Sequence, residues 1–401
     1  MTLRVALVSE HASPLAVHLG TADAGGQNVY VDALARHLAR AGAFVDVYTR
    51  RDNPSTPAVR DLAAGVRVHN VSAGPPEPIP KDDLFELMPE FGRRLSDAWR
   101  WQPPDVVHAH FWMSGWASQR ARWRHSVPLV QTFHALGVVK RRHQGVADTS
   151  PPDRDHVERG LLHCVDAMIA TCSDEVSELV ALGADAAKIT VIPCGVDNRF
   201  QPRPTPRHRP RIASVGRMVP RKGVADVIAA MALLREDAEL VIAGGAAGET
   251  DAEMARLQAV AAELGVVDRC RFVGQLGRDA AADLMRASDV VACMPWYEPF
   301  GIVPIEAMGC GVPVVGTAVG GLLDTIVDGV TGLLVEPRRP DLLASALDEL
   351  LADPGRRRRM GAAGAGRVDR LYRWPRVAGA VLDVYRAVIA GSVSSRQRAA
   401  L

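Results

Sequence analysis

The stretch "DVVACMPWYEPFGIVPIEAMGCG" (residues 289–311) decides the fold of the second half of the chain. It begins with a continuous apolar run, which is typical of a parallel strand covered on both faces. A loop with Glu298 follows, and Pro304 suits the first turn of a helix over "PIEAMGCG". The stretch therefore predicts a strand, an exit loop and a helix, which together are the repeating unit of a doubly wound α/β domain.

Similar apolar runs recur through the chain and predict further parallel strands. The expected strands are 4–9, 44–49, 66–72, 106–111, 128–134, 168–172, 189–195, 211–216, 239–245, 270–275, 289–295, 312–317 and 332–337. Helical patterns lie between them; in one, Val31, Leu34 and Leu38 share a face and Gly42 ends the helix. We expect two Rossmann-like doubly wound domains facing across a cleft, with ligands at the carboxyl ends of the strands.

A proline-rich segment separates the two halves. "RFQPRPTPRHRP" (199–210) carries four prolines and no hydrophobic periodicity, which is typical of an interdomain linker. The expected parts are a first domain over 1–200, a linker over 201–210, a second domain over 211–375, and a C-terminal helix over 376–401 that returns to the first domain and ends in a frayed tail.

Composition excludes several classes of function. With 48% hydrophobic residues, a chain of 401 residues can bury two cores, and a net charge of +1 gives no field that would gather nucleic acid or an anionic membrane. No run reaches the roughly 18 apolar residues of a membrane helix, and the first apolar run is too short for a secretory signal. Six scattered cysteines indicate free thiols in a reducing compartment, so we expect a cytoplasmic protein. The scarcity of lysine, four residues in all, indicates a GC-rich, actinobacterial-like genome.

Two strand-to-helix turns are candidate anion sites. Gly25 and Gly26 precede a helix, where backbone N–H groups are free and no side chain intervenes, although an ordinary tight turn explains two glycines equally well. Arg217 and Lys222 stand in the loop after the strand 211–216. Two fixed cations there are placed to neutralise a diphosphate, the alternative being a solvated basic loop.

His134, Glu298 and Glu306 are candidate polar contacts of a ligand. His134 closes a strand and can donate to a substrate oxygen, or it caps the strand structurally. The loop carboxylate of Glu298 adjoins backbone N–H groups that we expect to face the cleft. Glu306, in the first turns of the helix, suits the two hydroxyls of a ribose, or is simply stabilised by the helix dipole. As a hydrolase pair the two glutamates fit poorly, because catalytic carboxylates flank the scissile bond.

A metal ion is not expected. Asp153 and Asp155 form a D-x-D, but no apolar strand precedes them. If the ligand is a diphosphate, Arg217 and Lys222 already perform the task of a metal. We therefore expect no metal and no cofactor.

With these motifs in place, the chain resembles the family-4 retaining glycosyltransferases of GT-B fold nearly from end to end. "GRMVPRKG" (216–223) and "EPFGIVPIEAMGCGVPVVGTAVGG" (298–321) match the donor site of that family, including its E-x7-E spacing. Other segments are similar to the subgroup that holds sucrose-phosphate synthases and the D-inositol-3-phosphate N-acetylglucosaminyltransferases of mycothiol synthesis. These segments are "SEHASPL" (9–15), "DAGGQNVYV" (23–31), "PKDDL" (80–84), "HAHFWMSG" (108–115) and "FHALG" (133–137).

The resemblance implies transfer of a hexosyl group, with retention, from a nucleotide diphosphate sugar, a UDP-sugar being favoured. Arg217 and Lys222 would bind the diphosphate and assist bond breaking, and Glu306 would bind the ribose. Glu298 and His134 would contact the sugar and, with the two cations, form the catalytic set. The remaining donor contacts would be Gly25, Gly26 and the backbone N–H groups of Phe300, Gly301 and Ile302. With no nucleophile evident beside the anomeric carbon, we favour front-face attack.

For the acceptor, the resemblance implies a small phosphorylated sugar or cyclitol held by Gln27, Asn28, Lys81, Phe111 and Arg154. Lys81 and Arg154 match positions that grip the acceptor phosphate. Phe111 replaces a tyrosine of the inositol-phosphate subgroup, Ala135 a threonine, and Gln27 a methionine, so the acceptor stays open. The alternatives are a neutral natural-product or glycan acceptor, or a nucleotide-sugar epimerase of the same architecture. We expect no nucleic-acid partner, and a homodimer is compatible with the sequence.

Overall fold

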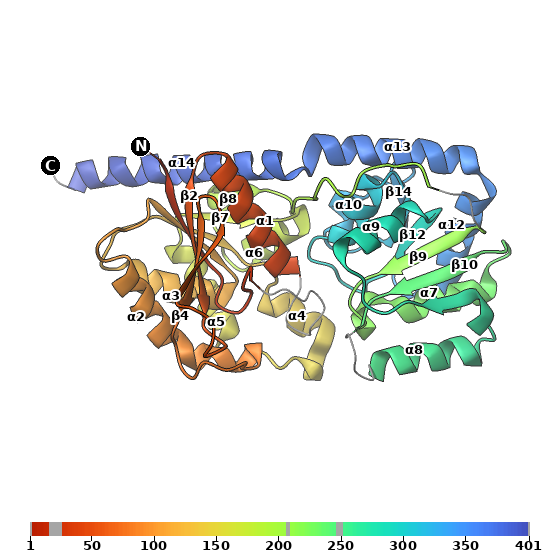
Figure 1. Cartoon of the computed structure of the whole chain (residues 1–401), viewed down its shortest axis with the longest axis horizontal. Coiled ribbons are helices and arrows are strands. Elements are labelled where there is room, and N and C mark those ends of the chain that lie inside the picture. The colour runs from red at the N-terminus through yellow and green to blue at the C-terminus, as the bar shows by residue number, and fades with distance from the viewer. Residues whose placement is uncertain (1, 16–25, 206–208, 246–251, 400–401) are drawn as a thin grey trace. The chain divides into compact units, whose positions relative to one another are not determined.

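The computed structural model describes residues 2–15, 26–205, 209–245 and 252–399, with side chains up to residue 392. Two compact units make up the chain (Figure 1). The first holds the described residues up to Pro193 together with helix α14 (Trp374–Ala399), and the second is Cys194–Arg373. Gly25 lies outside the described residues, so the expectation for it stays a prediction.

The first unit is built on an eight-stranded sheet in the order β3-β4-β2-β1-β5-β6-β7-β8, parallel except where β3 meets β4. Its strands are β1 (Arg4–Val8), β2 (Phe44–Arg50), β3 (Val59–Ala63), β4 (Val66–Val71), β5 (Val106–His110), β6 (Leu129–Thr132), β7 (Ala167–Ala170) and β8 (Ile189–Val191). The expected parallel strands of this half are all present. Strand β3 was not predicted, because its side chains are exposed or half-buried and form no apolar run.

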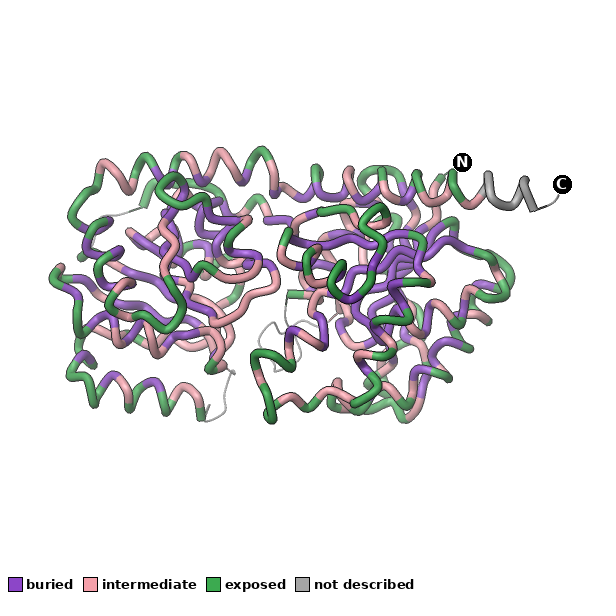
Figure 2. The backbone as a smooth tube through the Cα atoms, turned by 180° about the vertical axis from the view of Figure 1, so that it is seen from behind, coloured by how far each residue is buried: buried purple, intermediate pink, exposed green. Residues whose placement is uncertain are grey.

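Helices cover this sheet. They are α1 (Gly26–Arg40), α2 (Met88–Ala98), α3 (Trp112–Arg122), α4 (Gly137–Gln144), α5 (Arg154–Cys164) and α6 (Ser173–Ala181), with short 3₁₀ turns η1 (Lys81–Leu87), η2 (Gly145–Ala147) and η3 (Ala186–Lys188). The predicted face of α1 is buried: Val31, Leu34 and Leu38 are inaccessible to solvent. Burying each such side chain contributes about 1.5–3 kcal/mol. Figure 2 shows buried residues following the strands of both units.

Helix α14 belongs to the first unit through its packing. It lies against α1, and Tyr385 is fully buried with its hydroxyl 2.7 Å from Nδ1 of His108 on β5. Val377 and Val381 are buried as well, whereas Val384 and Val388 are half-buried. The final helix is thus fastened to the sheet by apolar contact and by one buried polar pair.

The second unit contains a six-stranded, wholly parallel sheet in the order β11-β10-β9-β12-β13-β14. Its strands are β9 (Arg211–Val215), β10 (Glu239–Ala243), β11 (Cys270–Phe272), β12 (Val290–Cys293), β13 (Val314–Thr317) and β14 (Gly332–Val335). Its helices are α7 (Val224–Leu233), α8 (Ala252–Glu263), α9 (Arg278–Arg286), α10 (Ile302–Gly309), α11 (Leu322–Thr325), α12 (Pro340–Ala352) and α13 (Pro354–Leu371), with 3₁₀ turns η4 (Pro220–Lys222) and η5 (Val267–Arg269). The prediction of two Rossmann-like α/β domains is confirmed. In the part of the chain that the structure describes, no helix has the length and apolarity needed to cross a membrane.

Each sheet contains one point where the strand order reverses. Strand β1 pairs with β2 on one side and β5 on the other, and β9 is flanked in the same way by β10 and β12. The loops that leave such neighbouring strands run in opposite directions and open a crevice at the carboxyl ends. These two reversal points, β1/β5 and β9/β12, are where the fold itself places a ligand site.

Candidate active site

Three loops meet at the β9/β12 reversal point of the second unit. The N–H of Trp296, in the loop after β12, donates to the carbonyl of Arg221 in the loop after β9, at 2.8 Å. The N–H of Gly321, after β13, donates to the carbonyl of Glu298 at 2.9 Å. The "GRMVPRKG", "EPFG" and "VGG" segments therefore form one backbone assembly although they are far apart in sequence.

Two glycines make this assembly possible. Gly223 has φ of 65°, and a Cβ there would lie 1.9 Å from the carbonyl oxygen of Met294. A Cβ on Gly321 would lie 2.4 Å from the Cα of Phe300. Both contacts are with backbone that cannot move aside, so only glycine allows the loops to approach this closely.

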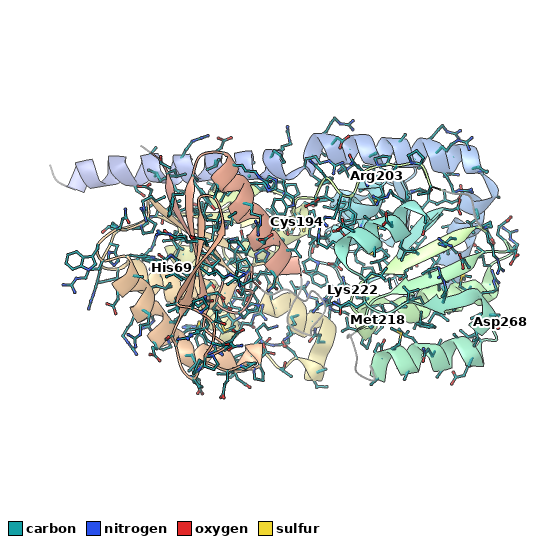
Figure 3. All side chains as sticks on the ribbon, in the orientation of Figure 1. His69, Cys194, Arg203, Met218, Lys222 and Asp268 are labelled. Atoms are coloured by element: carbon teal, nitrogen blue, oxygen red, sulfur yellow. The ribbon has the colours of Figure 1, made fainter. Side chains whose placement is uncertain are left out.

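Lys222 and Glu298 form an ion pair at the centre of the loop assembly. Lys222 is marked in Figure 3, and both side chains are largely buried. Burial alone would raise the pKa of Glu298, but Lys222, Arg221 and Arg217 lower it below its usual range. The structure thus brings together the cations that we expected at a diphosphate and the carboxylate that we expected at the sugar.

Helix α10 begins beside this pair. Its N-cap is Gly301, with φ of 92°, and Pro304 lies in its first turn as expected from the sequence. The helix starts at Ile302, two residues earlier than predicted. The first N–H groups of a helix have no acceptor within the helix. Phe300, which is buried, precedes the cap and places these groups on the same loop as Glu298.

Glu306 lies further along α10, where it is 7% exposed. Nη2 of Arg278, the first residue of α9, is 3.2 Å from Oε1 of Glu306. Burial raises the pKa of Glu306 to about 7, although Arg278 opposes this shift. Arg278 was not predicted from the sequence, because an arginine at a helix start is indistinguishable from any solvated residue. Its guanidinium lies 5.3 Å from the ring centroid of Phe200, which holds it in place.

In the first unit, two of the expected acceptor residues lie close to the aromatic ring of a third, Phe111. Nζ of Lys81 is 5.8 Å from the ring centroid of Phe111, and the guanidinium carbon of Arg154 is 5.0 Å from it. Phe111 follows β5 directly and has φ of 81°, which is uncommon for a residue other than glycine. Such strained positions are often functional sites.

Arg154 is almost completely buried, at 1% exposure. Its Nε donates to Glu158 at 2.7 Å, Nη2 donates to the carbonyl of Ala135 at 2.7 Å, and Nη1 is 3.2 Å from the hydroxyl of Ser150. Each guanidinium nitrogen therefore has a protein partner. Arg154 is thus one half of a buried ion pair with Glu158, and its guanidinium is held in a fixed position near the ring of Phe111.

His134 follows β6 with φ of 60°, and its Nε2 is 3.1 Å from Nδ1 of His110. Burial lowers the pKa of His134 to about 3, so the imidazole is neutral over the physiological pH range. Its contribution would be a hydrogen bond and not a positive charge. The strained backbone holds the ring against His110 and the ring of Tyr30.

The start of α1 supplies the other expected contacts. Nε2 of Gln27 donates to the hydroxyl of Ser9 at 3.1 Å and to the carbonyl of His110 at 3.3 Å. Asn28 is 5% exposed, and its amide donates to the carbonyl of Ser13 at 3.1 Å. Gly26 is the first residue of the helix and is exposed. Both amide side chains therefore brace the loop that follows β1.

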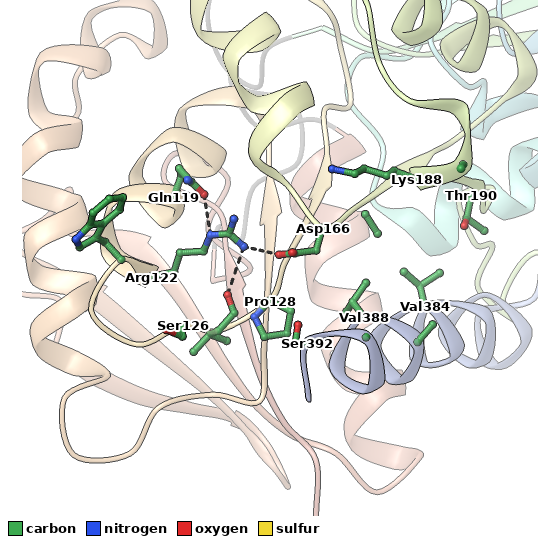
Figure 4. Close-up of a pocket in the computed structure, with 16 residues that line it drawn as sticks. Gln119, Arg122, Ser126, Pro128, Asp166, Lys188, Thr190, Val384, Val388 and Ser392 are labelled. Carbon is green, nitrogen blue, oxygen red and sulfur yellow. Dashed lines mark hydrogen bonds and ion pairs between the residues drawn. The ribbon is translucent and has the colours of Figure 1, made fainter. Parts of the chain in front are cut away.

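A separate groove of about 770 Å³ lies at the opposite, amino-terminal edge of the first sheet (Figure 4). Arg122 forms one wall, fixed by Gln119 at 2.7 Å and by an ion pair with Asp166, while Val384 and Val388 of α14 form another. None of the predicted site residues lines this groove, so it is not the candidate active site.

This chain is similar to known proteins over nearly its whole length. Residues 196–367 match the family described as "Glycosyl transferases group 1", and residues 25–195 match the "Glycosyl transferase 4-like domain". The chain is 41% identical to the D-inositol 3-phosphate glycosyltransferase of Xylanimonas cellulosilytica, over 95% of this chain and 96% of that protein. It is 38% identical to the enzyme of the same name from Mycobacterium tuberculosis, over 98% of this chain and 85% of that protein.

Among solved structures, sucrose-phosphate synthase from Thermosynechococcus elongatus superposes with a TM-score of 0.90 at 34% identity. The match covers 97% of this chain and all of that one.

Proposed function

Since this chain belongs to the group 1 glycosyl transferases of GT-B fold, we propose that it transfers a hexosyl group from a UDP-sugar to a small phosphorylated sugar or cyclitol. That it is a hexosyltransferase which uses a nucleotide sugar follows from its relatives. The proposal goes further than the relatives in three respects, which are the nucleotide base, the stereochemistry of transfer and the acceptor.

The observation that carries the donor half of the proposal is the cluster of Arg217, Arg221 and Lys222 around Glu298 at the β9/β12 reversal point. As the glycosidic bond breaks, negative charge develops on the departing nucleoside diphosphate. Cations that are already fixed in place stabilise this charge without reorganisation during the reaction. In this proposal Lys222 and Arg217 bind the diphosphate. Glu298 accepts hydrogen bonds from the sugar hydroxyls, and the first N–H groups of α10 donate hydrogen bonds to the hydroxyl oxygens.

Glu306 is proposed to bind the ribose. A carboxylate offers two oxygens to a cis diol, which offers two donors. Arg278 supports this role, because its hydrogen bond to Oε1 aims the carboxylate and favours its charged form. Glu298 and Glu306 would then contact two ends of one donor molecule.

Two observations support a phosphorylated acceptor. The relatives at 41% and 34% identity are named for an inositol phosphate and a sucrose phosphate. Lys81 and Arg154 also place two cations around Phe111 at the carboxyl end of the first sheet. The cations attract an anionic group, and the aromatic ring offers a flat apolar face to the carbon skeleton of a sugar or cyclitol.

For the chemical step we propose front-face attack with retention. The acceptor oxygen forms a bond to the anomeric carbon as the bond from that carbon to the diphosphate oxygen breaks. The electron pair leaves with the diphosphate, and a departing phosphate oxygen takes the acceptor proton. Glu298 is a poor candidate for a covalent nucleophile, because its pairing with Lys222 stabilises the carboxylate charge.

The test is to incubate the protein with a set of nucleotide sugars and with matched phosphorylated and neutral acceptors. Mass spectrometry would identify the product, and NMR would give its anomeric configuration. We expect turnover with a UDP-sugar, retention at the anomeric carbon, and a preference for phosphorylated acceptors. Inversion would exclude the proposed step, equal turnover of neutral acceptors would exclude the phosphate preference, and a new epimer formed without any acceptor would exclude the transferase reaction.

A further inference from the structure

A serine in the segment between η2 and α5 accepts hydrogen bonds from two cations at once. The hydroxyl oxygen of Ser150 is 3.0 Å from Nζ of Lys140 and 3.2 Å from Nη1 of Arg154. Lys140 lies on α4, and Arg154 is the first residue of α5. Ammonium and guanidinium groups carry only donors, so both lone pairs of the Ser150 oxygen are used as acceptors.

The hydroxyl proton of Ser150 is the group that this arrangement leaves over. A hydroxyl has two acceptor lone pairs and one O–H donor. Because the two lone pairs face Lys140 and Arg154, the proton points away from both cations, and the described residues offer it no acceptor. Cations that donate to an oxygen also polarise its O–H bond and strengthen it as a donor. Ser150 therefore carries a strong hydrogen-bond donor that is available to a ligand.

This donor lies at the site proposed for the acceptor. The guanidinium that binds the Ser150 oxygen is the same one that lies 5.0 Å from the ring centroid of Phe111. Arg154 is only 1% exposed, whereas Ser150 is half-buried. Ser150 is thus the more accessible of the two residues, and it lies within one hydrogen bond of a proposed acceptor residue.

Lys140 cannot bind a ligand in place of Ser150. An ammonium group has three N–H donors. Three oxygens surround the one of Lys140, namely the hydroxyl of Ser150 at 3.0 Å, Oδ1 of Asp148 at 3.0 Å and Oδ2 of Asp82 at 3.4 Å. Each donor therefore has a protein partner, and the two carboxylates offset the charge. What Lys140 does is fix the Ser150 oxygen from the side opposite to its own carboxylate partners.

We propose that Ser150 is a further acceptor-binding residue, whose hydroxyl donates a hydrogen bond to the phosphate of the acceptor, and that Lys140 is its positioning residue. The inference rests on the phosphorylated acceptor of the proposed function. An ionised phosphate only accepts hydrogen bonds, so it suits a hydroxyl whose lone pairs are already occupied. Such a hydroxyl cannot accept from a sugar hydroxyl, so Ser150 favours the phosphorylated acceptor over the neutral one.

The first measurement is the KM of Ser150→Ala for inositol 3-phosphate, or for the phosphorylated acceptor that the product screen prefers. We expect this KM to rise about tenfold, the loss of one hydrogen bond to a charged group, while the KM for the nucleotide sugar stays unchanged. Ser150→Thr keeps the hydroxyl and should retain most of the affinity. Ser177→Ala is the matched control, because that hydroxyl donates to the carbonyl of Ser173 at 3.2 Å and has no free proton.

A sulfate ester of the same polyol separates a direct contact from displaced cations. Near pH 8 a phosphate monoester carries about two negative charges, whereas a sulfate ester carries about one. Removing a neutral hydroxyl should weaken both esters by a similar factor, measured as KM or as inhibition constant. Removing a cation, as in Lys81→Ala, should weaken the phosphate ester more, because the Coulomb energy scales with charge. If Ser150→Ala also weakens the phosphate ester more, it acts by displacing cations and the direct contact is wrong.

The positioning role of Lys140 has its own readout. Lys140→Met should raise the KM for the phosphorylated acceptor, and this rise should be absent when Ser150→Ala is already present, because Lys140 acts through Ser150. A rise of equal size in both backgrounds would contradict that role.

The inference and the proposed acceptor site can fail separately. If Lys81→Ala raises the KM for the phosphorylated acceptor but Ser150→Ala does not, the Ser150 inference alone is wrong. If neither variant raises it, the proposed acceptor site fails and the inference fails with it.

Discussion

Lys222 and Glu298 lie 76 positions apart in the chain and form an ion pair where the loops after β9 and β12 meet. Each side chain stabilises the other, because an unpaired charge at this depth is strongly unfavourable. The pair therefore couples the proposed diphosphate site to the proposed sugar site. A substitution of either residue should therefore affect binding at both the diphosphate site and the sugar site.

Replacing Lys222 with alanine should weaken binding of the nucleotide diphosphate about tenfold to a hundredfold, the loss of one charge-assisted contact. Isothermal titration calorimetry with UDP measures this directly. Lys188→Ala is the matched control, since Lys188 donates to the carbonyl of Val165 in the first unit and is not a proposed site residue. Unchanged affinity in Lys222→Ala would remove Lys222 from the diphosphate site.

Donor affinity should depend on pH through Glu306. Burial raises the pKa of this carboxyl from its ordinary value of 4.5 to about 7, so it accepts the ribose hydroxyls best when ionised, above pH 7. Affinity for the nucleotide should fall as pH is lowered through about 7, and Glu306→Gln should abolish this part of the dependence. Calorimetric titrations between pH 6 and about 8.5 test the midpoint.

Arg278 should set the position of that midpoint. Its guanidinium opposes the rise of the Glu306 pKa, so Arg278→Ala should move the midpoint to higher pH. Arg256→Ala is the control, because Arg256 pairs with Glu253 on the surface of α8. A midpoint that does not move in Arg278→Ala would show that Arg278 has no influence on Glu306.

The same carboxyl has a consequence for stability. Between pH 4.5 and about 7 the folded protein retains a proton on Glu306 that the unfolded chain has lost, because the pKa of this carboxyl is higher in the folded state. The contribution of Glu306 to the free energy of unfolding is therefore fully present below pH 4.5 and falls as pH rises through this window. The fall is about 1.4 kcal/mol for every tenfold difference in proton affinity between the folded and unfolded chains. Nucleotide that binds the ionised form would offset this loss above pH 7.

Replacing Phe111 with tyrosine should strengthen recognition of a phosphorylated acceptor. Lys81 and Arg154 already lie 5.8 Å and 5.0 Å from the centroid of the Phe111 ring, and the strained backbone that presents this ring would be unchanged. An added hydroxyl there can donate to the acceptor phosphate, worth about threefold to tenfold in KM. A lower KM for phosphorylated acceptors, with no change for neutral ones, supports this placement of the phosphate; the same change for both would contradict it.

Glycine substitutions should have opposite effects at two sites. In Gly223→Ala the new Cβ would meet the Met294 carbonyl at 1.9 Å with φ of 65°, so we expect a loss of about 2–4 kcal/mol in stability and weaker donor binding. In Gly160→Ala the Cβ meets nothing within 4 Å and lies inside α5, so a gain of about 0.5–1 kcal/mol is expected. Denaturant unfolding followed by circular dichroism compares them, and equal effects would contradict the close approach at Gly223.

Much of the fold was predictable because buried parallel strands leave continuous apolar runs, as in β1, β9 and β12. Strand β3 was not, since an exposed edge strand such as "VRDLA" (59–63) carries no such run. Within the site, motifs indicated Lys222 and Glu298 separately, but their pairing depends on how two loops fold together. Arg278 was missed for the same reason: its importance comes from a contact with Glu306 across two helices, which no local pattern records.

The return of α14 to the first sheet has a consequence for protein engineering. Its buried tyrosine hydroxyl meets His108 on β5, and the helix packs on α1, although about 180 residues of the other unit separate it from Pro193. A chimera intended to exchange acceptor preference between two such enzymes must therefore graft two segments, the chain up to Pro193 and the final helix. With a single crossover near Pro193, the first sheet would come from one enzyme and the final helix from the other. The two partners of the His108–Tyr385 hydrogen bond would then come from different enzymes.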